Sequence, residues 1–216
     1  MKLCAQVLIL VQLPTLMAGA ELSGVLKAVE KHYNSARTIQ VLFQQSYTPQ
    51  RGPRRVESGT LFLLKPGRMR WEYQSPAGKL FLADGKNVYL YIPEANRVEK
   101  TNLRESEDLR APLAFLLGKL DFSRDFRQFT LSLQGPDVRV IAEPKSDRFP
   151  YTKVEFLVTA GHRIRYLQIV GQDNSLMEFT FEQERVNLPL PASLFQFRMP
   201  PGAEVVEASG GDQQGY

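Results

Sequence analysis

The stretch SGTLFLLKPGRMRWEY, residues 58–73, decides how the rest of the chain is interpreted. Its two arms flank Lys65-Pro66-Gly67, and Pro-Gly is a strong turn signal. Apolar and charged side chains alternate in the second arm. Met69, Trp71 and Tyr73 fall on one face, and the charged residues between them fall on the other. A period of two residues is typical of β-strands, so the stretch predicts two strands joined by a tight turn.

The same period continues on both sides of this stretch. Residues 79–93, KLFLADGKNVYLYIP, predict a hairpin around the turn signal Asp84-Gly85. The whole chain contains ten or eleven such strand patterns, and helical patterns appear at residues 22–36 and 108–120. No linker and no shift in composition divides the chain. We therefore expect a mainly β protein with helices (α+β), in which a single antiparallel sheet curls towards a barrel or half-barrel.

The composition excludes several kinds of site. The chain has 216 residues, with 27 Lys and Arg, 23 Asp and Glu, two His and one Cys. One cysteine excludes a disulfide framework within the chain and a Cys-rich metal site. Two histidines leave too few ligands for a His-based cluster, so we expect no metal and no cofactor. The net charge of +4 is small, and we expect no nucleic-acid partner.

The N-terminus has the pattern of a secretory signal peptide. One lysine precedes an apolar stretch at residues 7–13, and the small residues Ala18-Gly19-Ala20 follow. The apolar stretch is too short to span a bilayer. We expect residues 1–20 to be removed near Ala20, residues 21–206 to form the domain, and residues 207–216 to be a disordered tail. The alternative for the first segment is a buried or amphipathic N-terminal helix.

Catalytic motifs are missing from the sequence. The chain contains no nucleophile elbow, phosphate loop, zinc-binding helix or dinucleotide-binding glycine pattern. His32 and His162 have no visible partner and are interpreted as ordinary surface residues. The acidic residues alternate with basic ones along the predicted strands, as cross-strand pairs do. We therefore expect that the protein is not an enzyme.

Several predicted strands are apolar on both faces. Residues 61–64, 80–82 and 88–92 are the clearest cases. Only one face of a curled sheet meets the core, so something else must cover the second apolar surface. Helix 108–120 either fills the sheet as ordinary core or acts as a lid over a cavity for apolar ligands such as acyl chains. The residues alone leave these two interpretations open.

Three motifs resemble one known family. Residues 58–73 are similar to the core motif of the outer-membrane lipoprotein carriers, the LolA family: a Gly-x-Leu-aromatic strand, a basic residue with Pro, and an apolar-x-Trp strand. Residues 82–93 are similar to the second motif, in which Asp-Gly-Lys precedes an aromatic strand. Residues 194–202 match the closing Phe-x-Phe-x-x-Pro-x-Gly. The resemblance runs in order from about residue 22 to residue 206.

The resemblance implies a fold and a function. Family members are periplasmic chaperones with an incomplete barrel, a helical lid and a hydrophobic cavity. They accept acylated lipoproteins from an inner-membrane lipoprotein-release transporter and deliver them to an outer-membrane acceptor lipoprotein. We expect the same for this chain, as a monomer. The alternative is a periplasmic carrier or sensor of other lipids or glycolipids on the same fold.

The resemblance also suggests site residues. Lys65 falls where the family has a basic residue, usually Arg, that latches the lid, although an ammonium cannot reproduce a guanidinium fork. The expected lid residues are Leu113, Phe115, Leu116 and Leu117. The expected residues of the acyl-chain cavity are Leu61, Leu63, Met69, Trp71, Tyr73, Leu82, Val88 and Leu90.

A group of cations lies close together in the same part of the sequence. Either it faces an acidic partner protein or it is a solvated face. Its members are Arg51, Arg54, Arg55, Lys65, Arg68 and Arg70.

Overall fold

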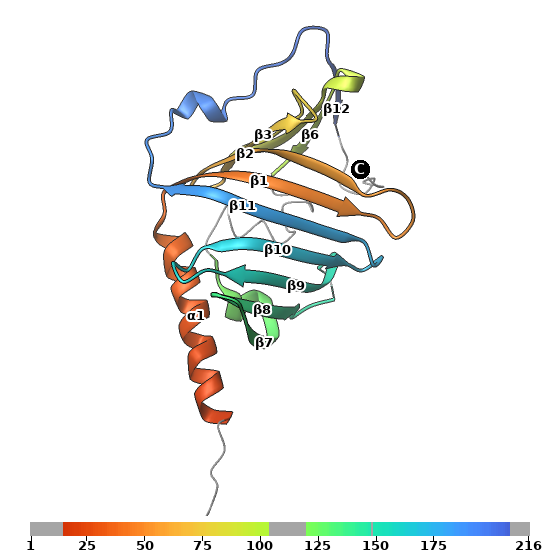
Figure 1. Cartoon of the computed structure of the whole chain (residues 1–216). Helices are drawn as coiled ribbons and strands as arrows, with labels where there is room; N and C mark the ends of the chain where they lie inside the picture. Colours follow the sequence, from red (N-terminus) through yellow and green to blue (C-terminus); the bar gives the residue numbers. More distant parts are fainter. Residues whose placement is uncertain (1–14, 104–119, 148, 208–216) are drawn as a thin grey trace, which may run out of the picture.

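A single twelve-stranded sheet forms most of the computed structural model (Figure 1). The model describes residues 15–103, 120–147 and 149–207, and side chains from residue 23 onward. The order of strands is β12-β6-β5-β4-β3-β2-β1-β11-β10-β9-β8-β7. Every neighbouring pair is antiparallel except β12 and β6, which are parallel. The predicted single, open, curled antiparallel sheet is therefore confirmed, with twelve strands in place of ten or eleven.

The strands of the first half are β1 (Thr38–Thr48), β2 (Arg55–Leu64), β3 (Arg68–Ser75), β4 (Leu80–Asp84), β5 (Asn87–Ile92) and β6 (Arg97–Asn102). The strands of the second half are β7 (Phe126–Gln134), β8 (Asp137–Pro144), β9 (Tyr151–Val158), β10 (Ile164–Gly171), β11 (Leu176–Val186) and β12 (Glu204–Glu207). The helices are α1 (Thr15–Ser35), α3 (Phe122–Asp125) and the short 3₁₀ turns η1 (Pro93–Ala95) and η3 (Ala192–Phe195).

The predicted hairpin of residues 58–73 is β2 and β3. Leu61 pairs with Trp71 and Leu63 pairs with Met69, so these four side chains share one face. The turn between the strands needs a glycine, because Gly67 has a φ of 74°. The alternation read from the sequence thus gives both the pairing and the face correctly.

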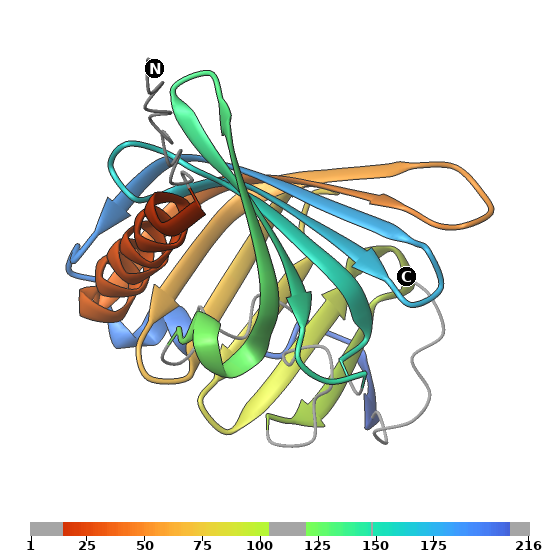
Figure 2. The same cartoon turned by 90° about the horizontal axis from the view of Figure 1, so that it is seen from below.

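The inner, concave side of the sheet holds the core. Its side chains come from both halves of the sheet, and α1 closes one end of it with Leu26, Val29 and Tyr33, all of which are buried (Figure 2). α1 begins at Thr15, earlier than the helix predicted at residues 22–36. The predicted cleavage near Ala20 stays a prediction. In the described ranges, no helix is both long and apolar enough to cross a membrane.

The chain after β11 covers the outer, convex side of the first half of the sheet. η3 packs against β3 and β4, and Phe195 at its end is 2% exposed. Phe197 stacks on Tyr89 of β5 with ring centroids 4.4 Å apart. β12 follows and lies beside β6 (Figure 1). This covering segment, residues 188–203, explains why strands β4 and β5 are apolar on both faces.

Candidate functional site

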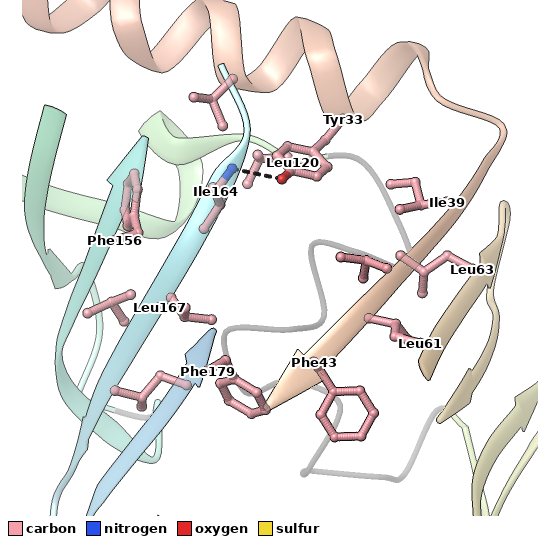
Figure 3. Close-up of a cluster of buried hydrophobic side chains, with 14 of the residues drawn as sticks. Tyr33, Ile39, Phe43, Leu61, Leu63, Leu120, Phe156, Ile164, Leu167 and Phe179 are labelled. Carbon is pink, nitrogen blue, oxygen red and sulfur yellow. Dashed lines mark hydrogen bonds between the residues drawn. The ribbon is translucent and has the colours of Figure 1, made fainter. Parts of the chain in front are cut away.

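The apolar residues of the predicted cavity lie mostly on the concave side of the sheet. Leu61, Leu63, Met69 and Trp71 are at most 3% exposed and belong to one cluster. The register continues the same face from Met69 to Ala83 and from Ala83 to Val88. Figure 3 shows two groups facing each other across this side: Phe43, Leu61 and Leu63 from β1 and β2, and Phe156, Leu167 and Phe179 from β9, β10 and β11.

The remaining expected cavity residues divide between the two sides of the sheet. Tyr73 packs against the same cluster, and Leu90 faces the same side because it pairs with Phe81. Leu82 is different: it pairs with Arg70 and Tyr89, whose side chains point outward. Its complete burial comes from the convex side, where η3 packs on β4. Leu82 therefore lies on the convex side and does not line the predicted cavity, because a strand that is apolar on both faces has no alternation to show which residues point inward.

Aromatic rings form much of the concave wall. Phe43 meets Trp71 edge to face with centroids 4.5 Å apart, and Trp71 lies 5.8 Å from Phe179. Phe179 in turn stacks with Phe181 at 5.8 Å. Edge-to-face and offset contacts such as these favour close packing without any polar partner. This part of the wall is therefore built from aromatic rings that pack against one another.

A small cavity remains between the C-terminal turn of α1 and the sheet. It measures about 20 Å³ and is lined by Tyr33, Ile39, Val41, Leu61, Leu63, Ile164, Phe181 and Glu184. A volume of this size holds one or two water molecules and is far too small for an acyl chain. In this arrangement, called the closed state below, α1 lies on the sheet, and a larger apolar ligand can enter at this end only if α1 moves.

A polar cluster fastens the end of α1 to the second half of the sheet. The Tyr33 hydroxyl donates to Glu184 Oε2 at 2.9 Å and accepts from the backbone N–H of Ile164 at 2.9 Å. His32 Nε2 lies 2.8 Å from Glu184 Oε1. His32 is therefore not the unpartnered surface residue that we expected. The partner, Glu184, lies more than 150 residues away, so no local pattern in the sequence points to it.

Lys65 reaches the same end of α1 from the β2–β3 turn. Its Nζ donates to the backbone carbonyl of Tyr33 at 2.7 Å, and burial lowers its pKa. The last carbonyls of a helix lack partners within the helix, so a cation here also stabilises the helix end. The expected lid residues Leu113, Phe115, Leu116 and Leu117 lie outside the described residues. The partner that the structure gives to Lys65 is thus α1, and a latch to residues 113–117 stays a prediction.

Hydrogen bonds fix the described residues on either side of positions 104–119. On one side, the backbone N–H of Leu103 donates to Lys86 O at 3.0 Å, and the Leu103 side chain packs against the core. On the other side, the amide of Asn34 in α1 brackets Leu120, accepting from its N–H at 2.7 Å and donating to its carbonyl at 2.8 Å. Leu103 is therefore fixed beside the start of β5, and Leu120 is fixed on α1.

The predicted group of six cations is split by the fold. Arg51, Arg54 and Arg55 are exposed around the β1–β2 turn. Lys65 and Arg68 lie beyond the opposite end of β2, a ten-residue strand that spans about 33 Å at 3.3 Å per residue. Arg70 points to the convex side and donates to Leu194 O at 3.1 Å. Closeness in sequence therefore did not mean closeness in space, and these residues are not one patch.

The Tyr33 hydroxyl provides a test of this cluster through pH. Burial, and then the charge of Glu184, raise the pKa of Tyr33 well above its usual value near 10. Above pH 10 the phenol ionises in the unfolded state but stays neutral in the folded state. The contribution of Tyr33 to the free energy of unfolding is therefore complete below pH 10 and is lost as the pH rises above it.

We expect the free energy of unfolding of wild type to fall more steeply between pH 10 and 11.5 than that of Tyr33→Phe, by up to about 1.4 kcal/mol per pH unit. Urea titrations of both proteins at each pH measure this slope. At pH 7, where the phenol is neutral in both states, the difference in the free energy of unfolding between wild type and Tyr33→Phe reports the lost hydrogen bonds alone. Parallel slopes would show that Tyr33 ionises as easily when folded as when unfolded.

Nothing in the described ranges resembles a metal centre. No group of three or more His, Cys, Asp or Glu side chains in residues 15–103, 120–147 and 149–207 is placed to hold a metal ion. The site is therefore an apolar concave surface with a polar fastening at its rim.

Comparisons with known proteins agree with this geometry. The family model described as outer membrane lipoprotein carrier protein LolA matches residues 34–198. An outer-membrane lipoprotein carrier protein from Chromobacterium violaceum is 28% identical over 194 residues, covering 88% of this chain and 91% of the relative.

Solved structures share the fold at low identity. An uncharacterized conserved protein from Thermus thermophilus is 14% identical, with a TM-score of 0.52, covering 87% of this chain and 99% of that chain. The structure of MucB is 13% identical, with a TM-score of 0.53, covering 87% of this chain and 66% of that chain. These structures show the shared fold, and the match of the family model over residues 34–198 shows that the chain belongs to the LolA family of outer membrane lipoprotein carrier proteins.

Proposed function

We propose that this protein is a periplasmic carrier that binds the acyl chains of lipoproteins on the concave side of its sheet and takes them from the inner to the outer membrane. The observation that carries the proposal is the continuous apolar concave surface among the described residues, which the end of α1 covers on one side. Curated relatives over most of the chain carry the name of outer-membrane lipoprotein carriers. The proposed activity is binding and transfer, without catalysis.

The closed state gives a physical reason for reversible binding. Each CH₂ group removed from water contributes about 0.8 kcal/mol, so a long chain on an open apolar surface would bind too tightly to be released. Loading this protein first requires breaking the contacts that fill the concave side, including those of Leu26, Val29 and Tyr33 of α1. That cost offsets part of the gain and keeps the affinity moderate.

We place the lid at segment 104–119. The described residues on either side of it, Leu103 and Leu120, both pack with the core on the concave side of the sheet. The apolar residues Leu113, Phe115, Leu116 and Leu117 are then the side chains that an acyl chain displaces. In this scheme Lys65 holds the neighbouring end of α1 closed through Tyr33 O. The partners are an inner-membrane lipoprotein-release transporter and an outer-membrane acceptor.

The test is to recover the cargo from cells. We expect the tagged full chain, produced in the periplasm, to co-purify with acylated lipoproteins that mass spectrometry identifies by their lipid-modified N-terminal peptides. Met69→Glu places a charge in the centre of the concave wall and should reduce this recovery at least tenfold, since an unpaired buried charge opposes apolar ligands. The matched control is Val56→Glu, at a side chain of the same sheet that is 50% exposed.

Two other results would contradict the proposal. Recovery of free lipids or glycolipids without lipoproteins would identify a carrier of other amphiphiles. An empty protein that also fails to take up a fluorescent fatty acid would show that the concave side is ordinary core. Because the buried charge of Met69→Glu can prevent folding, circular dichroism of each variant is compared. Competition of the fatty acid with lipoprotein on wild type tests the same surface without a mutation.

A further inference from the structure

One edge of the sheet is unpaired in the described structure. β7 lies at the end of the strand order and pairs with β8 alone among the described strands. Figure 2 shows it in green, running along the open side of the curled sheet toward the β7–β8 turn. Most of its residues are exposed. A row of backbone N–H and C=O groups is thus available on this edge for another strand.

This edge lacks the usual protection against pairing. Residues 129–134, FTLSLQ, contain no charge and no proline, and a bulge occurs only near the start of the strand, between Arg127 and Phe129. Natural edges usually carry charges or prolines that prevent pairing. The opposite edge follows that rule, because β12 is four residues long and has glutamates at both ends. The difference indicates that β7 is an edge suited to receive a strand.

The geometry of the hairpin shows which groups face outward. The two-residue turn Gly135-Pro136 makes Gln134 and Asp137 the closing pair, whose backbone groups bond to each other. Bonded and non-bonded pairs alternate along an antiparallel ladder, so Leu131 and Leu133 direct their N–H and C=O groups away from β8.

The side chains of this edge continue the apolar concave surface. Leu131 pairs with the fully buried Val140, and Phe129 pairs with Ala142. The Phe129 ring lies 6.5 Å from Phe122, which is itself stacked on Phe156 in the core. A strand added to β7 would therefore lie beside the surface on which we place the acyl chains.

We propose that β7 binds the extended polypeptide segment that directly follows the acylated residue of the cargo, as an added β-strand. The inference rests on the proposed function. Acyl chains on the concave side hold this segment near the open edge at a high effective concentration, of the order of millimolar, so weak pairing is sufficient. Pairing through backbone groups depends little on sequence, which suits cargo of differing sequence.

A second copy of the chain fits this edge less well. Two β7 strands would meet through about six residues each, which buries much less than the roughly 1,200–2,000 Å² of stable specific interfaces. A tethered cargo segment does not need so large an area, because its acyl chains already hold it in place.

The experiment compares three synthetic probes on the full chain. The first is a triacylated cysteine followed by a ten-residue uncharged peptide, the second is the same lipid without peptide, and the third carries the peptide with alternate residues N-methylated. We expect wild type to bind the first probe about tenfold more tightly than the other two. Hydrogen exchange should slow at Leu131 and Leu133 with the first probe only.

A matched pair of variants locates the effect. Leu133 is 82% exposed, so Leu133→Pro removes an outward N–H without disturbing the core. We expect this variant to lose the tenfold preference and Leu133→Ala to keep it. If Leu133→Pro does not fold, the N-methylated probe tests the same hydrogen bonds on wild type.

The outcomes separate the two proposals. Equal binding of all three probes would overturn this inference and leave the carrier function intact. Failure of every probe to bind would instead contradict the proposed function. Slow exchange at Leu131 without any probe, together with a dimer in sedimentation, would assign the edge to a second copy.

Discussion

Gly59→Ala should destabilise the fold more than any other single methyl group added at a described glycine. A Cβ at this position would lie 2.0 Å from the backbone oxygen of Glu72 and 2.9 Å from the Tyr73 Cα. These are main-chain atoms of β3, in the sheet beside the concave wall, so no side-chain rotation relieves the clash. The register between β2 and β3 also shifts at this point, between Ser58 and Gly59. Only a residue without a Cβ lets the two strands approach so closely.

We expect Gly59→Ala to cost about 3 kcal/mol of the free energy of unfolding, at the upper end of the cost of overpacking. For a domain of this size that corresponds to a fall in Tm of roughly 6–12 °C. Urea and thermal unfolding followed by circular dichroism measure both. Gly161→Ala is the control, because the nearest atom to its added Cβ, Thr159 Oγ1, is 3.8 Å away. Equal stability of the two variants would mean that the strands do not meet as described.

Features of the fold that depend on residues close in sequence could be predicted, and features that depend on residues far apart in sequence could not. Alternation in residues 58–73 gave β2, β3 and the inward face of Met69 and Trp71, because the strand period is a local property. Leu82 was assigned to the wrong side, because nothing local shows that residues 188–203 return to cover the convex face. For strands buried on both faces, the period no longer distinguishes one side from the other.

The hydrogen-bonded cluster at the end of α1 could not be predicted from the sequence for the same reason. His32 and Tyr33 lie in a helix whose pattern is easily seen, but their partner Glu184 is on β11, after ten other strands. The six cations show the opposite error, since the length of β2 separates residues that are close in sequence. Contacts that depend on the order of strands in the sheet therefore cannot be predicted from the sequence. The inward face of a strand and the position of a turn can be predicted, because both are local properties.

Glu184→Ala should make the protein retain its lipoprotein cargo more tightly. The carboxylate accepts from the Tyr33 hydroxyl at 2.9 Å, lies 2.8 Å from His32 Nε2, and has an 8% exposed side chain. Its removal takes away these acceptors at the rim of the cavity, at a cost to the closed state of about 1–3 kcal/mol. If binding requires α1 to move, it then starts from a less stable closed state. The free energy of binding becomes more favourable by the same amount.

That gain corresponds to roughly a 5- to 140-fold increase in affinity, since 1.4 kcal/mol is a factor of ten. Uptake of a fluorescent fatty acid measures it directly, and hydrogen exchange in α1 should become faster in the empty protein. Glu182→Ala removes the same charge two residues away on an exposed position of β11 and should leave both unchanged. Weaker uptake by Glu184→Ala, with α1 exchange unaltered, would show that this cluster forms part of the ligand site and does not hold the cover closed.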